Sequence, residues 1–280
     1  MSFIRRHRIV VFFVLAYALA WGAIPWNSFF APGVLLAALI VVSLTEGLTG
    51  LKALGARLIR WRVSWMWYAL AIGVPLLVHL ASAAINVGLG APPPSLGFLA
   101  PWYSLPMALA LHAISPTGGP LMEEPSFRGF AQPELQIRHS PMVATAIMAV
   151  LVTGWHAPLF FMPVFDAHPI GAVTTVAVTF WYAWLFNHAS GSSLLTLIAH
   201  GTEGGVLNSS IWSGGADLER LNYLYAIVWC VVALALLVFD RGFWTRRPSV
   251  DGGRVEPALP ARYSSSTATP EPDLSGRERR

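Results

Sequence analysis

The chain has 280 residues, of which 55% are hydrophobic and only 11% are charged, and its formal net charge is +4. Soluble domains carry roughly a quarter of charged residues, so this composition excludes an ordinary soluble protein and favours a multi-pass membrane protein. The small positive charge comes from arginines at segment ends, which argues against nucleic-acid binding. The single cysteine, Cys230, rules out an intramolecular disulfide.

Seven apolar segments approach the roughly 17–25 residues that a helix needs to cross a bilayer. In chain order they are residues 9–26, 29–44, 65–89, 142–162, 170–186, 193–207 and 223–239. The first shows no convincing cleavage site, so we expect it to remain as an anchor. Residues 96–137 would run roughly 60 Å as a straight helix, which is too long for one crossing. Because they are broken at Ser115-Pro-Thr-Gly-Gly-Pro120, we expect one interrupted crossing there, and eight crossings in an all-α fold.

Basic residues assign the two sides of the membrane. They lie before the first crossing and in alternate connections after it: Arg5, Arg6, Arg8, Lys52, Arg57, Arg60, Arg62, Arg138, Arg241, Arg246 and Arg247. The opposite loops hold one arginine, Arg220. The positive-inside rule thus predicts a cell-membrane protein with both termini in the cytoplasm. We expect residues 1–245 to form one domain and the polar residues 246–280 to form a disordered cytoplasmic tail.

Ionisable side chains inside a membrane cost about 2.5–3.5 kcal/mol each on insertion scales, so each needs a reason. Eight lie within the expected crossings: His79, His112, Glu123, Glu124, Arg128, His156, His200 and Glu203. His79 and His112 stand alone among apolar residues, and we expect both to be packing histidines with satisfied hydrogen bonds.

The two adjacent acids differ in their local partners. Glu124 and Arg128 are four residues apart, in the favourable order for an ion pair on one helical face, which predicts a buried structural pair. The residue four after Glu123 is Phe127, so Glu123 has no local partner. A membrane carboxylate of this kind needs a partner from another helix, and it suits a general base.

The turn near His139 and Ser140 supplies a candidate partner. Glu123 lies 16 residues before His139, and His156 lies 16 residues after Ser140. In an antiparallel hairpin these two side chains would stand level with each other, roughly 20–25 Å from the turn. Glu123 and His156 are therefore expected to form a pair.

A third candidate, His200, lies in the seventh crossing, with Glu203 three residues later on the same face. One interpretation is a hydrogen bond between the two within a single helix. Another is a zinc site, since His156, His200 and a carboxylate such as Glu123 make a reasonable ligand set. The HExxH pattern of zinc proteases is absent from the sequence, which weakens the zinc interpretation, and the expected cofactor is none or zinc.

Three separated motifs together resemble one known family. They are Glu123-Glu124-x-x-x-Arg128 in "EEPSFRGF", His156 in "WHAPLFF" and His200 in "LLTLIAH". Their wording and order are similar to those of the CPBP family, the CAAX-prenyl and bacteriocin-processing intramembrane proteases also called the Abi family, across roughly residues 121–208. The resemblance implies eight helices around a cytosol-facing polar cavity, in which Glu and His activate water.

The same resemblance implies a role for each matching residue. Glu123 would be the general base, His156 would orient the water, and His200 would stabilise the oxyanion. Glu124 and Arg128 would hold the helix of the first acid in place.

One position departs from the family pattern. The third motif usually has Asn four residues after its His, as a second oxyanion donor, and here that residue is Gly204. Losing one such donor typically lowers the rate about 100–1000-fold. Asn208, one turn further along, is the candidate substitute.

The leading expectation is an intramembrane endopeptidase that cuts membrane-embedded or lipid-anchored polypeptides. The alternative, favoured by Gly204, is a weak or inactive member that acts as a bacteriocin-immunity or membrane scaffold factor. A transporter that relays protons through buried Glu and His is a third reading, but no internal repeat supports it.

Overall fold

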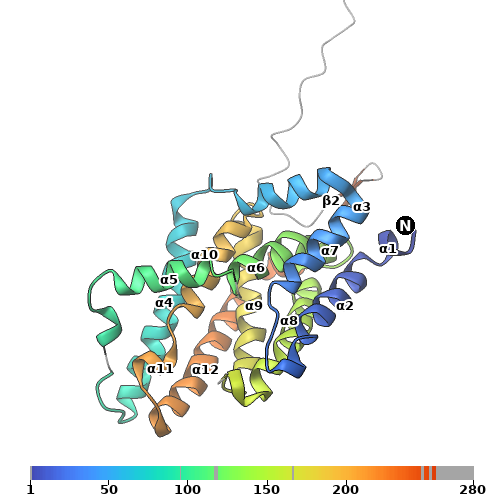
Figure 1. The fold of residues 1–280 in the computed structure, drawn as a ribbon. Helices are drawn as coiled ribbons and strands as arrows, with labels where there is room; N and C mark the ends of the chain where they lie inside the picture. The colour runs from blue at the N-terminus through green and yellow to red at the C-terminus, as the bar shows by residue number, and fades with distance from the viewer. Residues whose placement is uncertain are drawn as a thin grey trace, which may run out of the picture.

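The computed structural model describes residues 2–94, 96–116, 119–165, 167–246, 249–251 and 254–256 (Figure 1). In chain order its helices are α1 Ser2–Arg6, α2 Arg8–Trp21, η1 Ile24–Trp26, α3 Gly33–Leu58, α4 Trp65–Gly88, η2 Gly97–Leu99, α5 Ser104–Ala113, α6 Pro120–Ser126, the π-helical η3 Phe127–Ala131, α7 Gln132–Gln136, α8 Pro141–Phe161, η4 Pro163–Phe165, α9 Gly171–His188, α10 Ser193–Gly204, α11 Asn208–Ile211, α12 Gly215–Phe239 and α13 Arg241–Trp244. The body of the protein is all-α, as expected.

A short antiparallel hairpin follows the helical body. Its strands are β1 Ser249–Asp251 and β2 Arg254–Glu256, with Val250 opposite Val255. Apart from Arg246 and these strands, the tail predicted for residues 246–280 lies outside the described residues.

In the part of the chain that the structure describes, five segments are helical, long and apolar enough to cross a membrane: Arg8–Trp26, which is α2 with η1, and the helices α3, α4, α8 and α12. Their outer surfaces carry apolar side chains that are more than half exposed and suit contact with lipid, among them Leu77, Leu80, Val150, Ile227 and Val231. The protein is therefore a helical multi-pass membrane protein.

The other three expected crossings are less regular. α9 has 18 residues and α10 only 12, while residues 96–137 are divided among η2, α5, α6, η3 and α7. The break expected near Ser115 is thus present, and the count of eight crossings stays a prediction.

Helix α3 is longer than the sequence predicts. Its apolar run ends at Leu44, but the helix continues to Leu58, so Lys52 and Arg57 lie within it and not in a loop. α3 bends at Gly47, whose φ of 64° suits a residue without a side chain. In Figure 1 the part after the bend runs across the top of the bundle, at a steep angle to the part before it.

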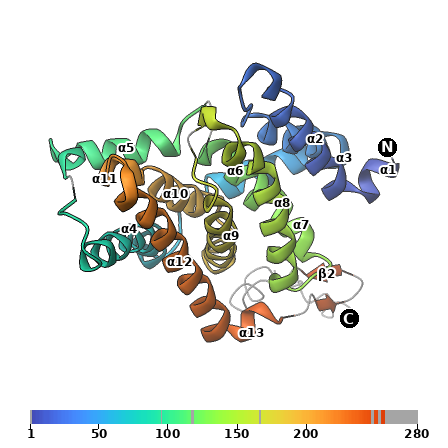
Figure 2. The ribbon, with the colours of Figure 1, turned by 90° about the horizontal axis from the view of Figure 1, so that it is seen from below.

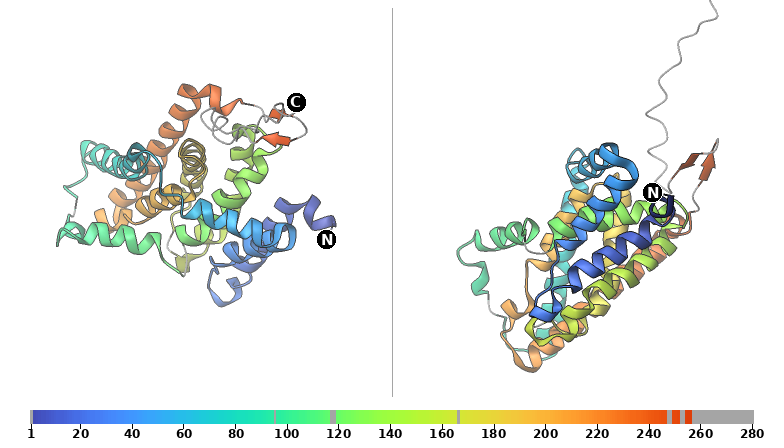
Figure 3. Two further views of the ribbon diagram at one scale, coloured as in Figure 1. Left: turned by 90° about the horizontal axis from the view of Figure 1, so that it is seen from above. Right: turned by 45° about the vertical axis from the view of Figure 1, so that its right-hand side comes forward.

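Two clusters of buried side chains hold the bundle together. One joins α2, α3, η3 and α8 and includes Phe127 and Trp155. The other joins α4, α9, α10 and α12 and includes Tyr182, Leu195 and Trp229. Figures 2 and 3 show α9 between α12 and α8, with α2 and α3 on the far side of α8. Arg128, which follows Phe127 of the first cluster, lies over the ring of Tyr182 of the second, so the two clusters meet there.

The basic loops share one end of the bundle, which we call the basic end. Arg60, after α3, donates to the carbonyl of Ser190 after α9 (2.6 Å), and His188 of α9 lies 3.0 Å from Asp240 beside α13. The loops at residues 162–170 and 205–214 lie at the other end (Figure 1).

Arg220, the one arginine expected at the end opposite the basic end, has hydrogen-bonding partners. Arg220 donates to Asp217 Oδ1 (2.7 Å) and to Asn86 Oδ1 (2.6 Å), so its charge is locally balanced. The charge asymmetry between the two ends is therefore stronger than a count of arginines indicates.

Candidate active site

Glu123 and His156 come together in the structure. Glu123 lies in the first turn of α6 and His156 in the last two turns of α8, and Nε2 of the imidazole is 3.5 Å from Oε2 of the carboxylate. Both side chains are largely buried, with exposed fractions of 17% for His156 and 7% for Glu123. The antiparallel hairpin predicted from the sequence places this acid and this imidazole at one level, as expected.

The hydrogen bonds of His156 locate its proton. Nδ1 lies 2.9 Å from the carbonyl oxygen of Val152, and because a carbonyl only accepts, Nδ1 must carry the hydrogen. In the neutral ring Nε2 is then an acceptor that faces a second acceptor, the Glu123 carboxylate. A proton shared between them, or a water that donates one hydrogen to each, resolves this arrangement. The pair is thus built to hold a water or a mobile proton.

Caps at the basic end fix the helices that carry the two site histidines. The Ser140 hydroxyl accepts from the N–H of Val143 at the start of α8, and the Ser192 hydroxyl accepts from the N–H of Leu195 at the start of α10, both at 3.4 Å. Such N-caps stabilise a helix start by about 1 kcal/mol. They set the register of each helix and hence the depth of His156 and His200.

Glu124 forms a second pair with His200. Nδ1 of His200 lies 2.9 Å from Oε1 of Glu124, and an Arg128 nitrogen lies 3.5 Å from the same oxygen. The Glu124 side chain is completely buried. The predicted pair of Glu124 and Arg128 is confirmed, but the interhelical partner His200 is an addition that the sequence did not reveal.

Aromatic contacts hold this second pair in place. The Arg128 guanidinium lies 4.9 Å from the centre of the Tyr182 ring, and the same ring stacks on His200 with centres 5.2 Å apart. Tyr182 thus spaces the cation from the imidazole while contacting both. The contacts leave little freedom for the His200 ring.

The hydrogen bond between His200 and Glu203 within α10, one of the interpretations left open by the sequence, is not formed. Glu203 instead accepts a hydrogen bond from the Tyr225 hydroxyl (2.9 Å) of α12, while the Glu203 carbonyl lies 3.1 Å from His79 Nε2. His79 also stacks on Tyr225, with ring centres 4.6 Å apart. His79 thus packs as expected, but its hydrogen bonds are only partly satisfied, because Nδ1 is buried without a partner among the described residues.

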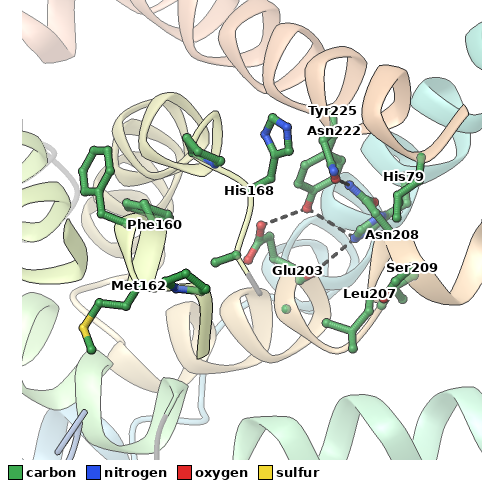
Figure 4. A pocket seen from close by; sticks show the side chains of 17 residues that line it. His79, Phe160, Met162, His168, Glu203, Leu207, Asn208, Ser209, Asn222 and Tyr225 are labelled. Carbon is green, nitrogen blue, oxygen red and sulfur yellow. Dashed lines mark hydrogen bonds between the residues drawn. The ribbon is translucent and has the colours of Figure 1, made fainter. Parts of the chain in front are cut away.

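A pocket of about 640 Å³, whose lining Figure 4 shows, begins near the helix ends that carry the two site histidines. Its lining includes Glu203 and Gly204 from the end of α10, and Phe160, whose ring stacks on His156. It also includes His168 in the loop after α8. The pocket therefore starts one turn from each site histidine and opens at the end opposite the basic end, whereas the sequence led us to expect a cavity on the arginine-rich side.

Asn208 does not reach the two pairs. Its side-chain amide donates to Asn222 Oδ1 (2.9 Å) at the wall of the pocket, as Figure 4 shows. Asn208 is the candidate substitute for a side chain at position 204, but its amide donates to Asn222 instead.

The three candidate zinc ligands are not assembled. Glu123 and His156 lie together, but His200 donates to Glu124. Within the described ranges of the chain, no group of three or more His, Cys, Asp or Glu side chains is arranged to hold a metal ion.

Comparison with known proteins finds a similarity in the region that carries the site. Residues 101–204 match the family model described as type II CAAX prenyl endopeptidase Rce1-like. No curated protein matches the chain. The matched region runs from just before α5 to the end of α10 and contains both acid–histidine pairs. Residues 101–204 are therefore similar to the domain of Rce1-like type II CAAX prenyl endopeptidases.

Proposed function

We propose that this protein is an intramembrane endopeptidase in which Glu123 and His156 activate a water molecule for attack on a peptide bond. The Rce1-like domain implies a protease. The observation that carries the proposal is the 3.5 Å approach of His156 Nε2 to Glu123, with Nδ1 fixed on the Val152 carbonyl.

In the proposed reaction a water lies between the Glu123 carboxylate and His156 Nε2. Glu123 takes one proton from the water, and the resulting hydroxide adds to the carbonyl carbon of the substrate. The tetrahedral intermediate collapses with cleavage of the C–N bond, and the proton held by Glu123 passes to the leaving amine. His156 orients the water and accepts its second hydrogen bond.

The second pair would stabilise the charge that develops on the carbonyl oxygen. When His200 is protonated, its Nε2–H can donate to the oxyanion while Nδ1–H stays on Glu124. Arg128 balances Glu124, so the supporting pair adds no unpaired charge. Such fixed donors act strongly because the site is buried and its dielectric constant is low.

We assign water activation to Glu123 and His156 without a metal, because the third candidate ligand, His200, has another partner in Glu124. Were zinc bound, Glu123, His156 and His200 would be its ligands and it would lower the pKa of the bound water.

The proposed substrates are membrane-embedded or lipid-anchored polypeptides. The proposed topology has eight crossings, residues 1–245 as one domain and both termini in the cytoplasm of a cell-membrane protein. The apolar exposed surface of the bundle supports direct contact with lipid and with substrates that arrive through it.

A second candidate function is a bacteriocin-immunity or scaffold factor with weak or no proteolysis. Gly204, in place of the Asn that is usual in the family, favours it, because one oxyanion donor is then missing from α10.

The deciding experiment compares protein N-termini in membranes that contain wild type, Glu123→Gln or His156→Ala. We expect a set of termini that is present with wild type and absent with both variants, at equal protein levels. His139→Ala, in the turn between α7 and α8, is the control and should leave the set unchanged. Identical termini in all four membranes, with the biological function retained by Glu123→Gln, would reject proteolysis in favour of the scaffold.

A further inference from the structure

The space beside Gly204 is filled by a side chain from another helix. A Cβ atom placed on Gly204 would lie 2.3 Å from Nε2 of His112 and 3.1 Å from two carbons of the same ring. Real Cβ atoms do not approach other atoms within 3.0 Å, so a larger residue at 204 requires the imidazole to move. Gly204 and His112 are therefore complementary: the glycine makes room for the histidine.

A glycine-rich face of α10 brings His112 to this place. Cβ atoms on Gly201 and Gly205 would lie 2.5 Å from Ala113 and within 2.9 Å of Leu109. The last turns of α5 thus pack directly on the backbone of α10, and the His112 ring lies between α5 and α10. On its other side the ring lies 3.6 Å from the Cβ position of Gly119, whose φ of +100° also favours glycine.

His112 points toward the two acid–histidine pairs. Its ring centre lies 6.5 Å from that of His200, with the two ring planes at 64° to each other. His112 is half-buried, and among the described residues neither of its ring nitrogens has a hydrogen-bond partner. The expectation of a packing histidine with satisfied hydrogen bonds is therefore wrong for His112, since it has a free donor beside the site.

We propose that His112 supplies the second oxyanion donor, in place of the side chain that position 204 lacks. This inference rests on the proposed function. Nε2 of His112, which lies 2.3 Å from the Cβ position of Gly204, would donate to the tetrahedral oxyanion formed from the substrate carbonyl, opposite the donor from His200. We do not assign this role to Asn208, because its amide lies in the pocket wall and donates there to Asn222.

The test uses full-length protein in liposomes and a quenched-fluorescence peptide that spans a cleavage site found in the membrane comparison above. His112→Ala should lower kcat about 100–1000-fold with little change in KM, because the donor acts only on the transition state. His112→Leu refills the space without an N–H and should be equally slow. Leu111→Ala, an exposed neighbour on α5, is the matched control and should be as active as wild type.

A relocated donor gives the sharpest result. Gly204→Asn alone should fold poorly or lose activity, because the new side chain collides with His112. The double variant His112→Ala with Gly204→Asn has room for the amide, and we expect it to recover at least about 10-fold in kcat over His112→Ala. Because it refills the space, it stays informative even where His112→Ala alone is unstable.

The two proposals fail in different ways. If no termini depend on Glu123, the protease proposal falls and His112 with it. If termini depend on Glu123 while folded His112→Leu cleaves within about threefold of wild type, the protease stands and His112 is a packing residue. Absence of recovery in a folded double variant would likewise overturn the donor role.

Discussion

Glu124 and His200 are hydrogen-bonded partners, 2.9 Å apart, although they are 76 residues apart in the chain and lie on different helices. The neighbouring acid Glu123 contacts a different histidine, His156. Side chains of adjacent residues on a helix point about 100° apart, so two consecutive acids can contact two different neighbouring helices. The pair of acids thereby ties α6 to both α8 and α10.

The first prediction concerns the buried charge of Glu124. Glu124→Ala leaves Arg128 buried without its partner, which should lower the free energy of unfolding by about 3–5 kcal/mol. Glu124→Gln keeps an acceptor for His200 and should cost less. Urea unfolding in detergent measures both. Glu46→Ala is the control, because Glu46 is 41% exposed in its pair with Arg8 and should contribute less than about 1 kcal/mol. Equal losses for Glu46 and Glu124 would show that burial of the pair is unimportant.

The second prediction concerns metal. Direct activation of water by Glu123 and His156 predicts that chelation leaves cleavage unchanged and that purified protein contains far less than one zinc per chain. Elemental analysis and cleavage rates before and after chelation measure both quantities. Loss of activity that zinc restores would instead show that His200 leaves Glu124 to join Glu123 and His156 at a metal.

The third prediction concerns the close packing of α5 on α10. Gly201→Ala places a methyl group 2.5 Å from the Ala113 side chain, which should destabilise the protein by about 1–3 kcal/mol. Gly73→Ala, in α4, meets nothing within 4 Å and should be neutral or stabilising by up to about 1 kcal/mol, since alanine favours a helix. Thermal unfolding of the two variants side by side measures the difference. A Gly201→Ala protein as stable as Gly73→Ala would mean that α5 does not pack as described.

The fourth prediction concerns the side of the membrane on which the pocket opens. In a Cys230→Ser background, Arg62→Cys reports on the basic end and Ser213→Cys on the opposite end; both positions are exposed. The positive-inside rule predicts that an impermeant maleimide labels Ser213→Cys in intact cells and Arg62→Cys only after permeabilisation. The reverse labelling would put the pocket of Figure 4 on the cytoplasmic side.

Relationships within one helical hairpin were predictable from the sequence. The level placement of Glu123 and His156 follows from helix rise and the turn at Ser140, and the contact of Glu124 with Arg128 follows from a spacing of four residues. Both need only local geometry, so nothing about the rest of the bundle had to be known.

Relationships between distant helices were not predictable. Tyr225, which donates a hydrogen bond to Glu203, lies on α12. The direction of its side chain depends on how α12 packs against α10. The position of His112 depends in the same way on α5, but here a signal existed. Glycines at 119, 201 and 204 permit a close approach of another helix, and the unusual glycine at 204 indicates that a side chain from elsewhere fills its place.

The π-helical turn η3 links the acid pair to the rest of the hairpin. Such a turn holds one residue more than a regular helix, so everything after it is rotated by about 100° relative to a continuous helix. With this rotation the Gln132 amide meets the Thr145 hydroxyl (3.2 Å) and Glu134 meets Arg8 (3.0 Å). Deleting a single residue from Phe127–Ala131 would make the helix regular. It would also turn Gln132 and Glu134 away from α8 and α2, so the helix that carries the two acids would lose both contacts.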